Sequence, residues 1–124
     1  MGWPPRPGES LPRAADAWCA QEKWLAWILA AEGHGPEWAK VLRVEAGHWE
    51  FTWATLKEAV REAAIETVRP LEAGSVSCGV TVEITIGRRT ALVVSAWHYA
   101  EPGAAPRLVT AYPTAYNRGY GSNA

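Results

Sequence analysis

Nowhere does this sequence contain the roughly eighteen consecutive apolar residues that a membrane-spanning helix requires. The N-terminal stretch MGWPPRPGES also lacks the apolar core of a secretion signal. We therefore expect neither a membrane partner nor export directed by this stretch, and predict a cytoplasmic protein.

Several familiar catalytic motifs are also missing. The sequence has no Gly-rich phosphate loop, no CxxC pair, no HExxH motif and no GxSxG motif. Nucleotide hydrolysis, zinc proteolysis and α/β-hydrolase chemistry therefore have no support in the sequence. Its three histidines, His34, His48 and His98, have no close carboxylate and no second ligand at metal-binding spacing. We predict neither a metal nor a cofactor.

Neither the net charge nor the cysteine content indicates a particular partner or a disulfide. The net charge is −1, so bulk electrostatics favour neither nucleic acid nor an anionic membrane as a partner. The two cysteines, Cys19 and Cys78, lie far apart in the sequence. Two cysteines permit one disulfide without arguing for it, and we expect a reduced pair with Cys78 packed in a strand.

The second half of the chain has the pattern of an antiparallel meander. Every even position from 76 to 86 is apolar, which predicts a strand with one wet face. Gly87 breaks the pattern, and a second run from Thr90 is apolar on both faces, which favours a central strand joined to the first by a hairpin. A third strand is predicted from Arg107 to Tyr112, with Leu108, Thr110 and Tyr112 sharing one face.

The first half has helical periodicity. We predict helices over 21–31 and 36–43, and a third that begins at Thr52 as its cap, with Phe51 and Leu56 forming a hydrophobic staple. Six of the eight tryptophans lie in this half. They form either a core of large rings, which we favour, or a broad aromatic surface.

These patterns predict the fold class and the domain layout. With 124 residues the chain suits a single core. We expect an α+β domain over 11–113, in which N-terminal helices pack on a C-terminal antiparallel meander of three to four strands. A flexible Pro-rich leader over 1–10 and a polar tail over 114–124 would flank it.

Two groups of polar residues could carry chemistry. His34 lies in a turn between helices and Lys40 follows six residues later. A histidine that moves a proton beside a cation that holds an anion suits metal-free phosphodiester cleavage. The alternative is a surface-loop histidine and a solvated lysine. His98, on the central strand, is expected to be a hydrogen-bonded core histidine.

The order of motifs resembles a small bacterial domain family that has no assigned function. Its members have an LPxA-type segment, a His-Pro-x-Gly-x-x-Lys-Ala turn, a Gly-Phe-Thr-like helix cap and a final Pro-Arg-Leu-x-Thr-x-Tyr strand. The counterparts here are LPRA, HGPEWAK, FT at Phe51 and Thr52, and PRLVTAYP. Gly35 replaces the family's proline, and Glu37 replaces its glycine, between His34 and Lys40.

The same arrangement more distantly resembles the barnase, EndoU, colicin and RelE superfamily of metal-independent RNases, many of them toxin domains. The resemblance implies that His34 acts as general base or acid, that Lys40 and Arg107 neutralise the phosphate, and that Thr110 and Tyr112 orient it. It also implies RNA as substrate and a cognate immunity or antitoxin protein as partner. The competing hypothesis is a non-catalytic protein-interaction module, such as a neutralising or adaptor partner, with a tryptophan-rich surface.

Overall fold

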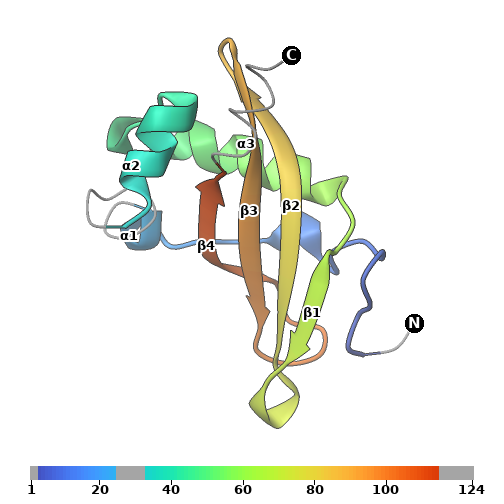
Figure 1. The fold of residues 1–124 in the computed structure, drawn as a ribbon. Helices are drawn as coiled ribbons and strands as arrows, with labels where there is room; N and C mark the ends of the chain where they lie inside the picture. Colours follow the sequence, from blue (N-terminus) through green and yellow to red (C-terminus); the bar gives the residue numbers. More distant parts are fainter. Residues whose placement is uncertain (1–2, 25–32, 115–124) are drawn as a thin grey trace.

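The computed structural model describes residues 3–24 and 33–114, which form helical elements followed by a four-stranded antiparallel sheet, with a further 3-10 turn, η5 (Glu72–Gly74), between the first two strands. The strands are β1 (Thr67–Pro70), β2 (Val76–Ile86), β3 (Arg89–Tyr99) and β4 (Arg107–Pro113), and their spatial order is also β1-β2-β3-β4. The predicted α+β class, with N-terminal helices and a C-terminal meander, is confirmed (Figure 1).

The long β2–β3 hairpin is the frame of the sheet. Its register runs without a break from Val76↔Tyr99 to Ile86↔Arg89, and Gly87 adopts the positive φ of 64° that the turn requires. Even positions of β2 and odd positions of β3 are buried. The prediction that β3 is a central strand is confirmed, with its odd positions buried and its even positions half-buried.

Helix α3 (Trp49–Arg61) packs across the buried side of the sheet and lies behind it in the view of Figure 1. We call the opposite side the front face. Its side chains come from Thr67 and Arg69 of β1, Ser77, Thr81, Glu83 and Thr85 of β2, Leu92, Val94, Ala96 and His98 of β3, and Arg107, Thr110 and Tyr112 of β4.

Tryptophans build much of the core, as favoured from the sequence. Trp24, Trp38 and Trp97 are fully buried, and Trp53 packs at their edge. The ring centroids of Trp24 lie 6.1 Å from those of both Trp38 and Trp53, and Trp53 lies 6.0 Å from Trp97. This continuous series of rings joins the helical half to the central strand.

The start of α3 differs from the prediction. A 3-10 turn, η4 (Ala46–His48), leads directly into the helix at Trp49, so Thr52 lies within the first turn and does not cap it. The Thr52 hydroxyl donates to the His48 carbonyl at 2.8 Å, and this bond satisfies the side chain inside the helix. The predicted staple is also absent, since Phe51 is 59% exposed while Leu56 is buried.

The shorter elements of the first half are η1 (Ala14–Asp16), α1 (Gln21–Lys23), α2 (Gly35–Glu37) and the π-helical η3 (Trp38–Leu42). The remainder of the helix predicted over 21–31 lies outside the described residues. The helix predicted over 36–43 is confirmed as α2 and η3, with Trp38, Val41 and Leu42 buried as expected.

The segment predicted as a leader contacts the domain along its described part. The Gly8 N–H donates to the Ile65 carbonyl at 2.8 Å, and the Trp3 indole donates to the Gly74 carbonyl at 3.1 Å. Just after it, the Pro12 carbonyl accepts a hydrogen bond from the buried Tyr99 hydroxyl. Residues 3–12 therefore run along the end of the sheet that carries β1.

Candidate functional site

A bulge in β4 determines which of its side chains reach the front face. The register shifts between Ala96 and Trp97 of β3, so that Trp97 pairs with Leu108 while Ala96 pairs with Thr110. Because paired residues share a face, Leu108 points into the core and Thr110 to the front. The predicted alternation, which put these two residues on one face, was wrong.

Because of the bulge, the three polar residues of the PRLVTAYP motif all lie on the front face. Arg107, Thr110 and Tyr112 pair with His98, Ala96 and Val94, three successive front-face positions of β3. Two residues of a strand span about 7 Å, so Thr110 lies midway between the other two. Their side chains are half-buried, and the Thr110 hydroxyl oxygen is buried without a hydrogen-bond partner in the described chain.

His34 completes this group from the helical half. Its ring lies 4.8 Å from the Tyr112 ring, centroid to centroid, at an interplanar angle of 31°. Its Nδ1 lies 2.9 Å from Glu37 Oε1, and its side chain is 28% exposed. A carboxylate at Nδ1 fixes the ring orientation and the position of the Nδ1 proton, so that in the neutral ring the free lone pair lies on Nε2.

Glu37 is the residue that the motif comparison misjudged. It stands where the resembled family has glycine, between His34 and Lys40, and the expectation that no carboxylate lies close to a histidine is wrong. A spacing of three residues across the first turn of α2 brings its carboxylate to His34. A search for a carboxylate within one helical turn of the histidine would have found this pair.

Trp38 attaches these helical elements to β4. Its indole N–H donates to the Ala111 carbonyl at 3.0 Å, and the side chain is fully buried. Ala111 lies between Thr110 and Tyr112. This hydrogen bond therefore fixes η3 next to the front-face residues Thr110 and Tyr112.

Lys40 is not brought into contact with the other four predicted residues. It is exposed on η3, two positions after Trp38, and makes no hydrogen bond or ion pair with the described residues. The structure thus brings His34 and Tyr112 together, aligns Thr110 and Arg107 beside them, and leaves Lys40 at the periphery.

The other two histidines differ in their surroundings. His98 is half-buried on the front face opposite Arg107, and no described residue hydrogen-bonds to its ring, so the prediction of a hydrogen-bonded core histidine was wrong. His48 accepts a hydrogen bond from the Glu45 N–H at its Nδ1, 3.1 Å away, and shapes the turn before α3.

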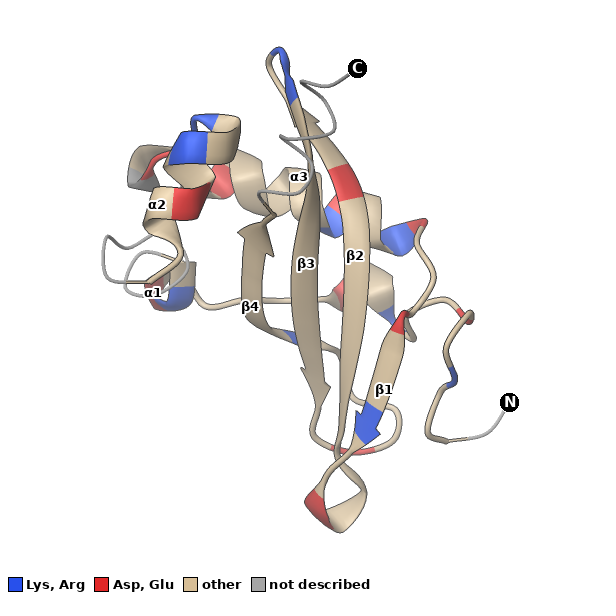
Figure 2. Cartoon of the chain, viewed as in Figure 1, with Lys and Arg blue, Asp and Glu red and all other residues tan. Residues whose placement is uncertain are grey.

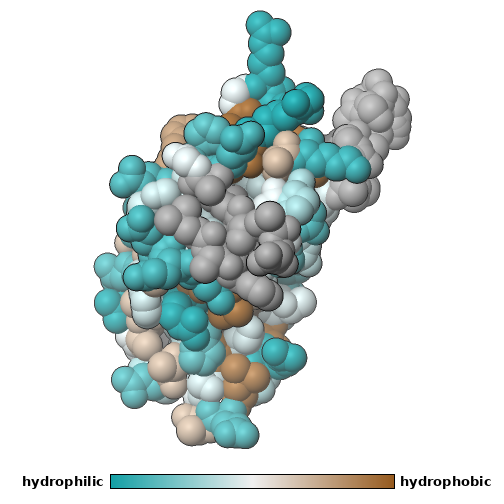
Figure 3. All heavy atoms as spheres, turned by 90° about the vertical axis from the view of Figure 1, so that its left-hand side faces the viewer, coloured by the Kyte–Doolittle hydropathy of each residue, from teal (hydrophilic) through white to brown (hydrophobic). Residues whose placement is uncertain are grey.

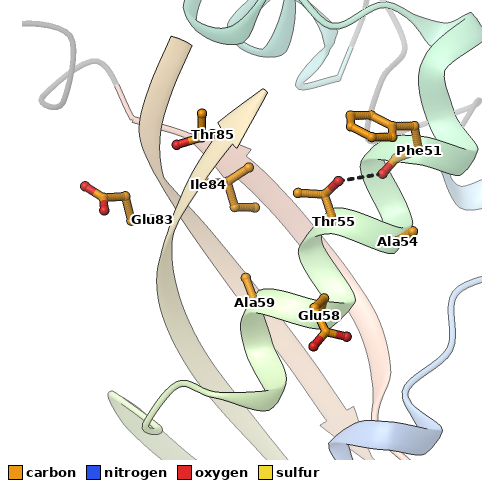
Figure 4. A pocket seen from close by; sticks show the side chains of 8 residues that line it. All are labelled: Phe51, Ala54, Thr55, Glu58, Ala59, Glu83, Ile84 and Thr85. Carbon is orange, nitrogen blue, oxygen red and sulfur yellow. Dashed lines mark hydrogen bonds between the residues drawn. The ribbon is translucent and has the colours of Figure 1, made fainter. Parts of the chain in front are cut away.

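A surface pocket lies elsewhere, between α3 and the end of β2 (Figure 4). Its volume is about 450 Å³, and it is lined by Phe51, Ala54, Thr55, Glu58, Ala59, Glu83, Ile84 and Thr85. The Thr55 hydroxyl donates to the Phe51 carbonyl at 2.9 Å. None of the predicted catalytic residues lines this pocket.

The cysteines are free thiols, as expected. Burial raises the pKa of Cys78 to about 11. Burial also raises the pKa of Cys19 to about 11, against the opposing effect of Lys23 and Arg107. Neither thiol has the lowered pKa of a catalytic cysteine.

The described part of the chain has neither a metal-binding cluster nor a membrane-spanning helix. It contains no cluster of three or more His, Cys, Asp or Glu side chains that could bind a metal ion. It also contains no helix of the length and apolar character needed to cross a bilayer.

Comparisons of the chain with models of known protein families, with curated proteins and with solved structures found no match. Both resemblances drawn from the motifs therefore stay predictions.

Proposed function

We propose that this protein is a metal-independent ribonuclease-like domain of the toxin type that cleaves RNA phosphodiesters. One observation carries the proposal. The His34 imidazole, which the Glu37 carboxylate orients, packs against the Tyr112 ring, and Tyr112 is followed along the front face by Thr110 and Arg107. A proton-transfer group beside donors for an anion is the minimum that metal-free phosphoryl transfer requires.

In this proposal, the residues of β4 bind the phosphate. The phosphate would lie over Thr110, where the guanidinium of Arg107 and the hydroxyls of Thr110 and Tyr112 bind its non-bridging oxygens. The buried, unpartnered hydroxyl of Thr110 would gain a hydrogen bond there. Lys40, exposed on η3, would add long-range attraction for the polyanion.

His34 would move the proton. Its Nε2 takes the proton of the ribose 2′-hydroxyl as that oxygen attacks phosphorus, and Glu37 stabilises the resulting imidazolium. The bond to the 5′-oxygen breaks, and that oxygen takes up the proton from the His34 imidazolium. The products are a 2′,3′-cyclic phosphate and a 5′-hydroxyl, with no net change in protons on the enzyme.

The required nucleophile gives a direct test. A DNA oligonucleotide with one embedded ribonucleotide should be cut only on the 3′ side of that ribose, in the presence of EDTA. The all-DNA oligonucleotide should stay intact, because it has no 2′-hydroxyl. Cleavage of both, or of neither over a wide protein range, would refute the proposal.

A second candidate, a non-catalytic interaction module, is favoured by the pocket beside Phe51. Phe51 is 59% exposed next to Ala54, Ala59 and Ile84, an apolar surface that a protein partner could cover. Of the tryptophans that could form the surface first suggested for this role, Trp38 is buried, Trp18 is 49% exposed and Trp27 lies outside the described residues. On the side where α2 and η3 lie, the described hydrophobic residues show as separate spots among polar ones (Figure 3).

The two candidate functions predict different effects of the same two variants when the protein is expressed in bacteria. If the domain is a ribonuclease toxin, its expression in bacteria arrests growth, His34→Ala relieves the arrest, and a cognate immunity or antitoxin protein would relieve it too. If it acts only by docking, Phe51→Ser abolishes its effect and His34→Ala does not.

A further inference from the structure

A row of polar and basic side chains crosses the front face at the end of the sheet where β4 begins. The strand register pairs Arg69 with Ser77, Ser77 with His98, and His98 with Arg107. Neighbouring strands lie about 4.8 Å apart, so the row spans about 14 Å. In Figure 2 the basic segments of β1 and β4 mark its two sides.

Trp18 extends this row past the edge of the sheet. It forms a parallel bridge with Arg107, in which the Trp18 N–H donates to the Pro106 carbonyl and the Leu108 N–H donates to the Trp18 carbonyl. Paired residues share a face, so the Trp18 ring lies on the same side as the Arg107 side chain. Ala17, the preceding residue, is buried, while Trp18 is 49% exposed.

The row carries positive charge although the whole chain has a net charge of −1. Neither Arg69 nor Arg107 forms an ion pair within the described chain. Two carboxylates lie at the front face, both farther along the sheet than the row. Glu66 accepts a hydrogen bond from the Thr81 hydroxyl at 2.8 Å, four residues along β2 from Ser77, or about 13 Å. Glu83 lies six residues along β2 from Ser77, about 20 Å away. Glu72 and Glu101 belong to the turns beyond the row and form no ion pair with either arginine.

We propose that this row, formed by Trp18, Arg107, His98, Ser77 and Arg69, binds single-stranded RNA beyond the cleavage position. Cationic side chains that follow a backbone, together with an exposed aromatic ring on which a base can stack, are typical of sequence-tolerant single-strand binding. Trp18 stacks one base, and the two arginines hold flanking phosphates. A duplex is excluded, because its stacked bases cannot reach the indole.

This inference rests on the proposed function and deepens it. Arg107 belongs to both groups, since Thr110 and Tyr112 follow it on β4 and His98 lies opposite it. A strand bound along the row would therefore enter the His34–Tyr112 site at Arg107. Residues far from His34 would then determine how tightly a long substrate binds, while leaving the cleavage step unchanged.

The test measures binding with a ligand that cannot be cleaved. A fluorescent 2′-O-methyl oligonucleotide of about ten nucleotides is titrated with the full chain at several salt concentrations. We expect Trp18→Ala to weaken binding about tenfold and Trp18→Phe to retain most of it. Arg69→Gln should reduce the slope of log K against log salt by about 0.7, because one phosphate contact is lost.

Matched variants control for general effects. Phe51→Ala removes another exposed aromatic ring, and Arg61→Gln removes one positive charge from α3, on the other side of the sheet. Both should bind as the original protein does. Ser77→Glu places a carboxylate in the middle of the row and should weaken binding more than either control.

The outcomes separate this inference from the proposed function. If the oligonucleotide binds as expected but plain RNA is not cleaved, the proposal that the row binds single-stranded RNA is supported and the ribonuclease proposal fails. If RNA is cleaved but Trp18→Ala and Arg69→Gln bind like the controls, the row is refuted and the ribonuclease proposal stands. Equal or tighter binding of a duplex, or no binding by the original protein, also overturns the inference.

Discussion

The His34 imidazole and the Tyr112 ring lie 4.8 Å apart, centroid to centroid, although they come from opposite halves of the chain. The contact depends on two features. Trp38 anchors η3 to β4, and the β4 bulge turns Tyr112 to the front face. A residue of the helical half thereby meets the last strand in one place, which is the requirement for a composite catalytic site.

The carboxylate of Glu37 should control the tautomer of His34. In Glu37→Gln the amide N–H₂ can donate to Nδ1 and move the ring proton to Nε2, where a base is needed. We expect Glu37→Gln to lower kcat on RNA at least about tenfold, and Glu37→Asp to lower it less. Steady-state kinetics on a short oligoribonucleotide measure this. Equal rates for Glu37→Gln and the original protein would show that the pair is only structural.

Phosphate binding should depend on the planar, two-pronged guanidinium of Arg107 as well as on its charge. Arg107→Lys keeps the charge but loses bidentate contact with a phosphate, so kcat/KM should fall about tenfold. Lys40→Gln should have a smaller effect that vanishes at high salt, because Lys40 is exposed and its charge is screened. The comparison is made at two salt concentrations. A larger, salt-independent loss in Lys40→Gln would place Lys40 at the phosphate and contradict this assignment.

The indole hydrogen bond of Trp38 should contribute to stability. Trp38→Phe retains an aromatic ring but leaves the Ala111 carbonyl without this donor, and should lower the free energy of unfolding by about 1–3 kcal/mol. Trp49→Phe is the control, because Trp49 is half-buried and its indole makes no hydrogen bond to the described residues. Urea denaturation reports both values. Equal losses would mean that the hydrogen bond adds nothing.

Stability should fall at alkaline pH. Burial raises the pKa of Cys78 from about 9 to about 11, and burial, with a smaller contribution from Cys78, also raises the pKa of Tyr99. Above about pH 9 the unfolded chain releases these protons while the folded chain keeps them, so the free energy of unfolding decreases between pH 9 and 11. The urea midpoint should therefore drop over this range, and less steeply in Cys78→Ala. A urea midpoint that stays constant between pH 9 and 11 in the original protein would show that burial of Cys78 and Tyr99 does not make stability depend on pH.

The sequence predicted the sheet better than the site. Strict alternation along β2 and a glycine at its end were enough to predict the hairpin, because period two and turn chemistry are local properties. The β4 bulge depends on pairing with β3, so no pattern within PRLVTAYP could reveal that Leu108 and Thr110 face opposite sides. The start of α3 was missed for a related reason, since a 3-10 turn and not a Thr52 cap begins the helix.

Which of the predicted site residues lie together depends mostly on tertiary contacts, which the sequence pattern does not reveal. His34 and Tyr112 were grouped through the resemblance, and their contact needs the tertiary anchor of Trp38. Glu37 lay within one turn of His34 and could have been inferred from helical spacing alone. The position of Trp18 beside Arg107 comes from an isolated bridge between distant segments, which periodicity does not encode.

The central claim is that His34 transfers a proton during metal-free RNA cleavage. The most direct measurement is the rate at which a 2′,3′-cyclic phosphate end forms on total RNA in EDTA, for the original protein and for His34→Ala at equal concentration. We predict formation by the original protein and a loss of at least about a hundredfold in the variant, with its fold intact by circular dichroism. Equal rates for the two proteins, or no cyclic phosphate from either, would contradict the claim.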